Sequence, residues 1–258
     1  MEKELLLESG DLLVPCKICA PDHAPIRQVV LGVHGLGGNM EDDIQTSIAE
    51  EMVMFSCASV RFDMPCHGTS PMGEDGFTLE NCKFSLLAAA LQGWKSFPEA
   101  KNLCIFATGF GAYVALVSLP ELLTITENIR LVVQTPSVLM HQTLLSMIRR
   151  SQETFRSMDV FRFPLERPLT VSYSFYEELL AHNVMFPQPI PMLILHGEKD
   201  DYIPMEHIQN FRRINEDSKL VIIPGASHRF QEEGVWDMVL DLTRDWFEFQ
   251  QVLLMDCE

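Results

Sequence analysis

The segment NLCIFATGFGA (residues 102–112) decides the fold of this chain. Its residues 103–107 are apolar without polar alternation, which is typical of a strand buried on both faces of a parallel sheet. Gly109 and Gly111 then allow the backbone to turn tightly, and a helix is predicted over 111–119. A buried strand that turns sharply into a helix is the building unit of α/β folds.

The same succession of strands and helices continues on both sides of this segment. Short apolar or β-branched runs predict strands, and apolar residues at helical spacing predict helices. The predicted strands are 13–19, 27–33, 57–62, 102–107, 129–134, 191–196 and 219–223. The predicted helices are 78–94, 111–119, 141–158, 173–183, 205–216 and 234–252. We therefore expect one α/β domain over residues 1–258, with a mostly parallel, twisted sheet flanked by helices.

One connection is much longer than a crossover in such a fold requires. Residues 135–191 separate two predicted strands, and they hold two helical patterns joined by FRFPLERPLTV (residues 161–171), whose prolines oppose a continuous helix. We predict an insertion over about 136–190 that acts as a lid, because α/β sheets bind ligands beyond the carboxyl ends of their strands. The alternative is a second crossover helix with additions that contact no ligand. Most of its aromatic residues are expected to form its own core: Phe155, Phe161, Phe163, Tyr173, Phe175 and Tyr176.

The composition is that of an acidic globular protein. Apolar residues make up 47% and charged residues 21% of the chain. The 19 Lys and Arg residues against 36 Asp and Glu give a net charge of −17, which opposes binding to nucleic acids and anionic membranes. The first residues carry acids where a secretory signal needs basic and then apolar residues, and seven cysteines suit reduced thiols. We expect a cytoplasmic protein that binds neither nucleic acid nor membrane; no pattern indicates its oligomeric state.

Four further loops rich in polar residues and glycine follow predicted strands. They are HGLGGN (residues 34–39), FDMPCHGTS (residues 62–70), HGEKDDYIP (residues 196–204) and GASHRF (residues 225–230). Together with the turn at 107–111 they make five motifs at strand ends in a fixed order along the chain. Each motif alone is a weak signal, whereas five in order are a strong one.

In this order the motifs resemble those of the α/β-hydrolases, and most of all those of bacterial serine esterases of the cinnamoyl and feruloyl esterase type. The resemblance covers nearly the whole chain and implies an α/β-hydrolase fold without metal or other cofactor. The family's order of nucleophile, acid and histidine assigns these positions to Gly109, Asp200 and His228. The resemblance also implies an oxyanion hole formed by the backbone N–H groups of Leu36 and Phe110.

The nucleophile position departs from the family pattern. The family motif G-x-S-x-G is ATGFG here (residues 107–111), so Gly109 stands where a serine hydroxyl should attack the acyl carbon. Glycine adopts the strained conformation of such a turn freely, so the fold should persist. The resemblance thus implies a carboxylic-ester hydrolase scaffold for small acyl or aromatic esters that is impaired or inactive. The alternative is a non-catalytic relative that binds a small apolar ligand or a protein partner. A natural loss and a deliberate replacement of the serine both fit the sequence.

Three other side chains are candidates to replace the missing hydroxyl. Thr108 precedes the turn position, so its side chain should point elsewhere. Cys66 has the better intrinsic nucleophile but is expected to be a small buried loop residue. Ser137 follows a predicted strand and Pro136, which favours a turn or helix-cap role.

The remaining polar motifs are interpreted as structural. His34, His67 and His196 are expected to fix loops through hydrogen bonds to the backbone. Asp201 competes with Asp200 for the acid position, but the spacing H-G-x-x-D selects Asp200. The acids at 41–43 are typical of the first turn of a helix. Cys16 and Cys19 have redox spacing but lie in a strand-like run, and no second cysteine pair completes a zinc site.

Overall fold

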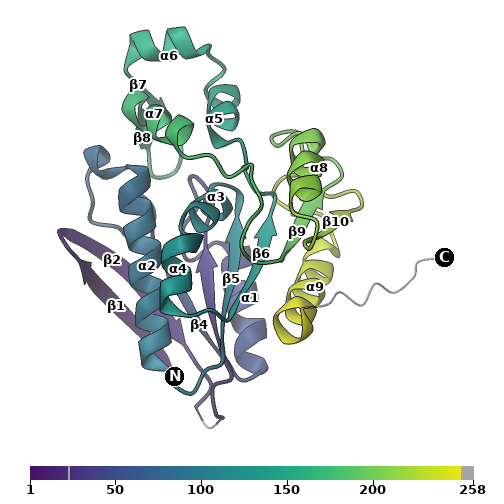
Figure 1. The fold of residues 1–258 in the computed structure, drawn as a ribbon. Coiled ribbons are helices and arrows are strands. Elements are labelled where there is room, and N and C mark those ends of the chain that lie inside the picture. Colours follow the sequence, from purple (N-terminus) through teal and green to yellow (C-terminus); the bar gives the residue numbers. More distant parts are fainter. Residues whose placement is uncertain (23, 251–258) are drawn as a thin grey trace.

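The computed structural model describes residues 1–22 and 24–250, and a sheet of eight strands forms its centre (Figure 1). The strand order is β1-β2-β4-β3-β5-β6-β9-β10. Strand β2 pairs antiparallel with β1 and with β4, whereas all other neighbours pair parallel. This confirms the predicted mostly parallel sheet. The strands are β1 (Glu2–Ser9), β2 (Leu12–Cys19), β3 (Gln28–Val33), β4 (Cys57–Phe62), β5 (Asn102–Thr108), β6 (Ile129–Gln134), β9 (Met192–Gly197) and β10 (Lys219–Ile223).

Helices cover both faces of this sheet. On one face, α1 (Asp43–Met54) and α9 (Val235–Phe249) pack on strand residues such as Val30 and Phe106. The other face is covered by α2 (Leu79–Ser96), α3 (Gly109–Val117), α4 (Leu119–Ile125) and α8 (Met205–Ile214). Successive residues of one strand therefore enter two different hydrophobic cores. For this reason the central strands read as unbroken apolar runs.

Two predicted helix starts are confirmed. The hydroxyl of Thr78 accepts a hydrogen bond from the Asn81 N–H at 3.1 Å and so caps α2. Helix α1 begins at Asp43 with Asp42 in the capping position, so residues 41–43 do lie at a helix N-terminus. A single turn of 3-10 helix (Glu74–Gly76) precedes α2.

The segment between β6 and β9 differs in part from the prediction. The helix expected over 141–158 is two helices, α5 (Met140–Ile148) and α6 (Gln152–Met158). Arg149 between them has a left-handed φ of 52°, and the hydroxyl of Ser151 accepts a hydrogen bond from the Thr154 N–H, which restarts the helix. The segment joining the helical patterns forms a β-hairpin of β7 (Val160–Phe163) and β8 (Leu169–Ser172), followed by α7 (Tyr173–Ala181).

The insertion shares the hydrophobic core on one face of the sheet and is also fastened to the rest of the molecule by hydrogen bonds. Most of its aromatic side chains are buried, namely Phe155, Phe163, Tyr173, Phe175 and Tyr176. The expectation that they form a separate core is wrong, because the Phe175 ring lies 4.6 Å from that of Phe77 and 5.9 Å from that of Phe110, between centroids. From the hairpin, the Arg167 guanidinium donates to the carbonyl groups of His67, Gly68 and Met72 at 2.7–3.2 Å. Figure 1 shows the insertion gathered at one end of the molecule, beyond the ends of the central strands. Within the described residues, no helix combines the length and apolarity needed to cross a membrane.

Candidate functional site

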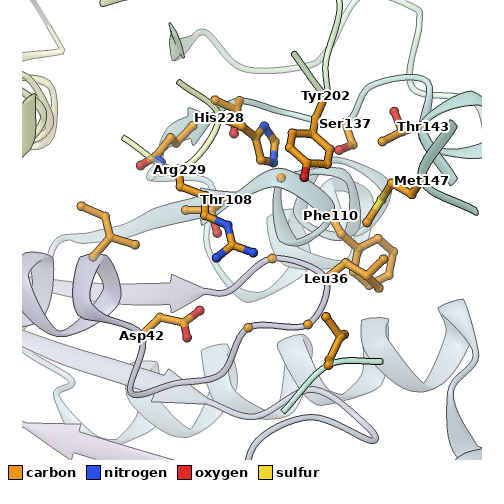
Figure 2. Close-up of a pocket in the computed structure, with 18 of the residues that line it drawn as sticks. Leu36, Asp42, Thr108, Phe110, Ser137, Thr143, Met147, Tyr202, His228 and Arg229 are labelled. Atoms are coloured by element: carbon orange, nitrogen blue, oxygen red, sulfur yellow. The ribbon is translucent and has the colours of Figure 1, made fainter. Parts of the chain in front are cut away.

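A cavity of about 640 Å³ lies at the carboxyl ends of the central strands and extends beneath the insertion (Figure 2). The loops after β3, β5, β6, β9 and β10 contribute to its lining, as do α5 and the β7–β8 hairpin. Four of the five predicted site residues line it, namely Leu36, Gly109, Phe110 and His228. The fifth, Asp200, contacts His228 with a side chain that is 0% exposed. The structure therefore brings the five predicted residues to one place.

His228 and Asp200 form a hydrogen-bonded pair. The His228 Nδ1 lies 2.8 Å from the Asp200 Oδ2, and the two residues follow the adjacent parallel strands β10 and β9. The other carboxylate oxygen of Asp200 accepts the N–H groups of Tyr202 and Ile203, both at 2.9 Å. Burial acts to raise the pKa of Asp200, but the hydrogen bond to His228 and the two amides outweigh it, so the pKa lies below its usual value. An ionised Asp200 thus orients the imidazole and leaves its Nε2 for the cavity.

Gly109 occupies the turn between β5 and α3 in a left-handed conformation, with φ of 51°. A Cβ atom placed on it would meet no heavy atom within 4 Å outside its chain neighbours. Two residues on, a Cβ on Gly111 would lie 2.2 Å from the carbonyl oxygen of His34, so α3 packs directly against the loop after β3. The turn has the conformation expected of a nucleophile position, with open space where a side chain would stand.

Both predicted oxyanion-hole amides are free of partners within the fold. The Leu36 N–H has no hydrogen-bond partner among the described residues. Phe110 lies in the first turn of α3, where amide groups have no acceptor within the helix. Both residues line the cavity together with Gly109 and His228.

Two buried histidines hold the glycine loop that carries Leu36. The His34 Nε2 accepts the Met64 N–H at 3.0 Å, and the His67 Nε2 accepts the Gly37 N–H at 2.9 Å. In each ring the Nδ1 donates to a nearby carbonyl, that of Gly35 or Pro65. Burial lowers the pKa of His34 to about 4 and that of His67 to about 3, so both rings are neutral and can accept these bonds. Their predicted structural role is confirmed.

The prediction for His196 is wrong in its detail. The ring is fully buried, but neither nitrogen makes a hydrogen bond with a described residue. Its Nδ1 lies 3.8 Å from the Asp200 Oδ2, on the oxygen that His228 already binds. His196 therefore lies beside Asp200 beneath the loop, while the short hydrogen bond to this oxygen comes from His228.

None of the alternative nucleophiles has the geometry of an activated group. Cys66 is buried outside the cavity lining, its Sγ donates to the Gly73 carbonyl, and burial raises its thiol pKa to about 11. Thr108 and Ser137 line the cavity, but neither hydroxyl has a hydrogen bond to His228 in the described part of the chain. Ser137 belongs to a turn, since Leu139 is the residue that precedes α5. Asp201 is exposed at the cavity, while Asp200 makes the contact with His228.

Several cavity residues were not predicted from the sequence. Gln134 ends β6, Arg149 follows α5, Tyr202 has its ring centroid 5.1 Å from that of His228, and the Arg229 side chain points toward Asp42 (Figure 2). Tyr202 and Arg229 belong to the motifs at 196–204 and 225–230 but were assigned no role there, whereas Gln134 and Arg149 lie outside the five motifs and only end a strand or follow a helix. In the described residues no three or more His, Cys, Asp or Glu side chains are placed to hold a metal ion.

No protein-family model matches the chain, and no curated protein matches its sequence significantly. Solved structures match it over nearly its whole length. Alpha/beta hydrolase domain-containing protein 10 from mouse matches with a TM-score of 0.75 and 16% identity, over 96% of this chain and 100% of its own. Est1E from Butyrivibrio proteoclasticus with ferulic acid bound has a TM-score of 0.75 and 17% identity, over 95% of this chain and 98% of its own. Dienelactone hydrolase from Anabaena variabilis has a TM-score of 0.65 and 18% identity, over 96% of this chain and 97% of its own.

These similarities establish the fold. The chain has the α/β-hydrolase fold that its five motifs predicted. Its polar site lies at the sheet edge where proteins with open α/β sheets bind ligands.

Proposed function

We propose that the cavity is the site of a carboxylic-ester hydrolase that lacks its nucleophile. The observation that carries this proposal is the Asp200–His228 hydrogen bond of 2.8 Å beside the left-handed turn at Gly109. A serine hydroxyl at this turn would attack an acyl carbon, His228 would take its proton, and the oxyanion would accept the Leu36 and Phe110 amides. Without it the acyl-enzyme route is closed, and only His228 acting as a general base on water remains.

The direct test is to restore the hydroxyl with Gly109→Ser. We expect turnover of a short-chain or aromatic ester to rise by at least about two orders of magnitude, a cautious part of the roughly million-fold effect of a catalytic serine. The assay is a panel of nitrophenyl and hydroxycinnamoyl esters. A serine-directed phosphonate should label Gly109→Ser and leave the original chain unlabelled.

Gly109→Ala is the matched control, because it adds the same Cβ in the same conformation without the oxygen. It should remain at the level of the original chain, and Gly109→Ser combined with His228→Ala should lose most of the gain. A folded Gly109→Ser that hydrolyses no ester of the panel and resists the phosphonate would falsify this assignment.

The cavity also supports a substrate class. The insertion contributes the apolar side chains of Met140, Met147, Phe163 and Leu165 to the cavity lining, and also Thr143, Ser146 and Arg149. Ferulic acid bound to the structural neighbour Est1E is a small aromatic acid. We therefore propose small acyl or aromatic esters as substrates of the restored enzyme, with the insertion as a lid over the acyl or alcohol group.

A second candidate function is binding without catalysis. The absence of a side chain at Gly109 favours it, because the cavity, the acid–histidine pair and the glycine loop are all present while the reacting atom is missing. In this case the chain binds a small ligand in the same cavity. Retention of a ligand by the original chain, at an affinity that Gly109→Ser does not increase, would distinguish this function from the first.

A further inference from the structure

The turn at Gly109 leaves open space at the polar end of the cavity. A Cβ atom on Gly109 would meet no heavy atom within 4 Å outside its chain neighbours, and Gly109 lines the cavity together with His228. Figure 2 shows the His228 ring directed into the cavity beside the ring of Tyr202. In a serine esterase the protein's own hydroxymethyl group fills this space and gives its proton to the histidine. In the present chain the same space admits the hydroxymethyl group of a small alcohol.

A buried acceptor without a partner lies close to this space. Gln134 is 3% exposed and lines the cavity, and its Oε1 has no hydrogen bond to any described residue. Gln134 ends β6 and is paired in the sheet with Thr108 of β5, which directly precedes Gly109. Buried polar groups nearly always have partners. An unpaired oxygen therefore points to a ligand that brings a hydroxyl or N–H group, and it disfavours the acceptor oxygens of an anion.

The charges around the cavity favour a neutral ligand. Three carboxylates line it, those of Asp42, Asp43 and Asp201, together with the guanidinium groups of Arg149 and Arg229. The carboxylates and the net charge of −17 oppose an anion, and the guanidinium groups oppose a cation. An alcohol with more than one hydroxyl group supplies donors without a charge. It is therefore the class of ligand that fits both the Gln134 oxygen and the charges of the lining.

We propose that the present chain transfers an acyl group from an activated ester to a small neutral alcohol with a second hydroxyl group. The reacting hydroxyl lies at the open space beside Gly109, within reach of His228, and the second hydroxyl donates to the Gln134 Oε1. The acyl carbonyl oxygen accepts the amides of Leu36 and Phe110. This activity rests on the proposed function, because it uses the same acid–histidine pair and amides, but it needs no nucleophile from the protein.

The reaction is a single displacement. The His228 Nε2 takes the proton of the alcohol, and the alcohol oxygen bonds to the acyl carbon while an electron pair of the carbonyl double bond moves onto the carbonyl oxygen. When that pair returns, the bond between the acyl carbon and the leaving oxygen breaks, and His228 gives the proton to the leaving oxygen. One ester and one alcohol are consumed, and a new ester and a new alcohol are formed. No covalent intermediate with the protein arises.

The experiment supplies the original chain with nitrophenyl butyrate and compares ethylene glycol with n-propanol, in which a methyl group replaces the second hydroxyl. Chromatography separates hydroxyethyl butyrate or propyl butyrate from butyrate. We expect hydroxyethyl butyrate to form at least about a hundredfold faster than without protein, the lower end of general-base catalysis, and its rate to saturate with ethylene glycol. The rate with n-propanol at equal concentration should be about three- to tenfold lower, the effect of one hydrogen bond.

Gly109→Ala tests the space for the alcohol. Its methyl group stands where the carbon of the bound alcohol is expected, so the alcohol must shift away from His228. Formation of hydroxyethyl butyrate should fall by at least about tenfold, a part of the roughly hundredfold that a misplacement of about 1 Å can cost. Gly10→Ala is the matched control, because it adds the same methyl group to a left-handed turn with open space outside the cavity lining. It should transfer as the original chain does.

Gln134→Met tests the second contact. It replaces the acceptor by an apolar side chain of similar size, and no hydrogen bond of the Oε1 within the described chain is lost. Transfer to ethylene glycol should fall to about the rate found with n-propanol, while transfer to n-propanol should not fall. An effect of the substitution on the fold alone would lower both rates together.

Three results would each overturn the proposal: no saturable formation of hydroxyethyl butyrate by the original chain, undiminished transfer by Gly109→Ala, or equal loss of both products in Gln134→Met. Inhibition of transfer by the serine-directed phosphonate would overturn it too, because no hydroxyl of the protein takes part. If Gly109→Ser hydrolyses esters while the original chain forms no transfer product, this inference alone fails. An inert Gly109→Ser removes the proposed function as well.

Discussion

Gly109 and Gly111 lie in one turn, and glycine is favoured at each for a different structural reason. Gly109 has a left-handed φ of 51° and open space around it, so only the backbone conformation favours glycine there. Gly111 has no such φ, but its Cα lies against the carbonyl oxygen of His34, so only the close approach requires glycine. A serine at the first position is therefore strained but accommodated, while any side chain at the second forces two backbone segments apart.

Because the reason for glycine differs at the two positions, we predict different losses of stability for the two alanine variants. Gly109→Ala should lower the free energy of unfolding by about 1 kcal/mol, the usual order for left-handed backbone at a residue other than glycine. Gly111→Ala should cost roughly 2–3 kcal/mol or more, because its Cβ would lie 2.2 Å from a backbone oxygen. Urea unfolding measures both. Gly10→Ala, with a φ of 61° and open space in a hairpin turn, is the control and should match Gly109→Ala. Equal losses at 109 and 111 would contradict this account.

The elements that the sequence predicted well are those buried on both faces or bounded by a cap. The seven predicted strands are present nearly to the residue, since their apolar runs have no competing interpretation. Strand β1 was missed because it lies at the sheet edge, where Leu5, Leu7 and Ser9 are half-buried and the other residues, Leu6 included, are exposed. Its signal was the Gly10–Asp11 turn before β2. Helices α1 and α4 were not predicted as full elements either; α4 is short, and of α1 only the acidic start at 41–43 was predicted.

The site residues likewise divide into those with a clear sequence signal and those without one. Asp200, His228 and the glycine turns were predictable because each belongs to a short motif after a strand. The unpaired side-chain oxygen of the buried Gln134 was not predictable, because burial without a hydrogen-bond partner is visible only once the surrounding chain is folded. The break between α5 and α6 was missed because Arg149 adopts a left-handed conformation, which is uncommon for arginine and could not be predicted from its residue type.

We predict that the Arg167 side chain controls local opening of the β7–β8 hairpin. Arg167→Gln removes a charged donor that binds three carbonyl groups of the loop at 67–72. Amide exchange in the hairpin and in this loop should become at least about tenfold faster, with smaller changes in the central strands. Hydrogen exchange with mass spectrometry measures this. Arg162→Gln is the control, because its ion pair with Glu74 is exposed and should change exchange little. Equal effects of both variants would show that Arg167 does not fasten the hairpin.

The fold brings residues that are far apart in the sequence together at one site. The strand order puts the loops after β3, β5, β6, β9 and β10 along one edge of the sheet, so residues 36, 109, 137 and 228 line one cavity. Two hydrophobic cores hold these strands, and neither core contains Gly109. The acid–histidine pair and the glycine loop are held by their own hydrogen bonds, none of which involves a side chain at position 109.

The buried histidines beside the site make the stability of the whole molecule depend on pH. His34 and His67 have pKa values of about 4 and about 3 in the fold, against 6.5 as the ordinary value. Between these values the unfolded chain binds protons that the folded chain does not, so the free energy of unfolding must fall as pH falls from about 7 toward 4. By pH 5 the loss should be roughly 1–2 kcal/mol for each histidine. The depressed pKa of Asp200 adds a further loss only below about pH 4. Urea unfolding at pH 7, 6 and 5 measures the slope, which His67→Gln should reduce, because a glutamine oxygen can accept the Gly37 N–H without titrating. A stability that is level from pH 7 to 5, or a slope that His67→Gln leaves unchanged, would show that these rings are not held neutral by the fold.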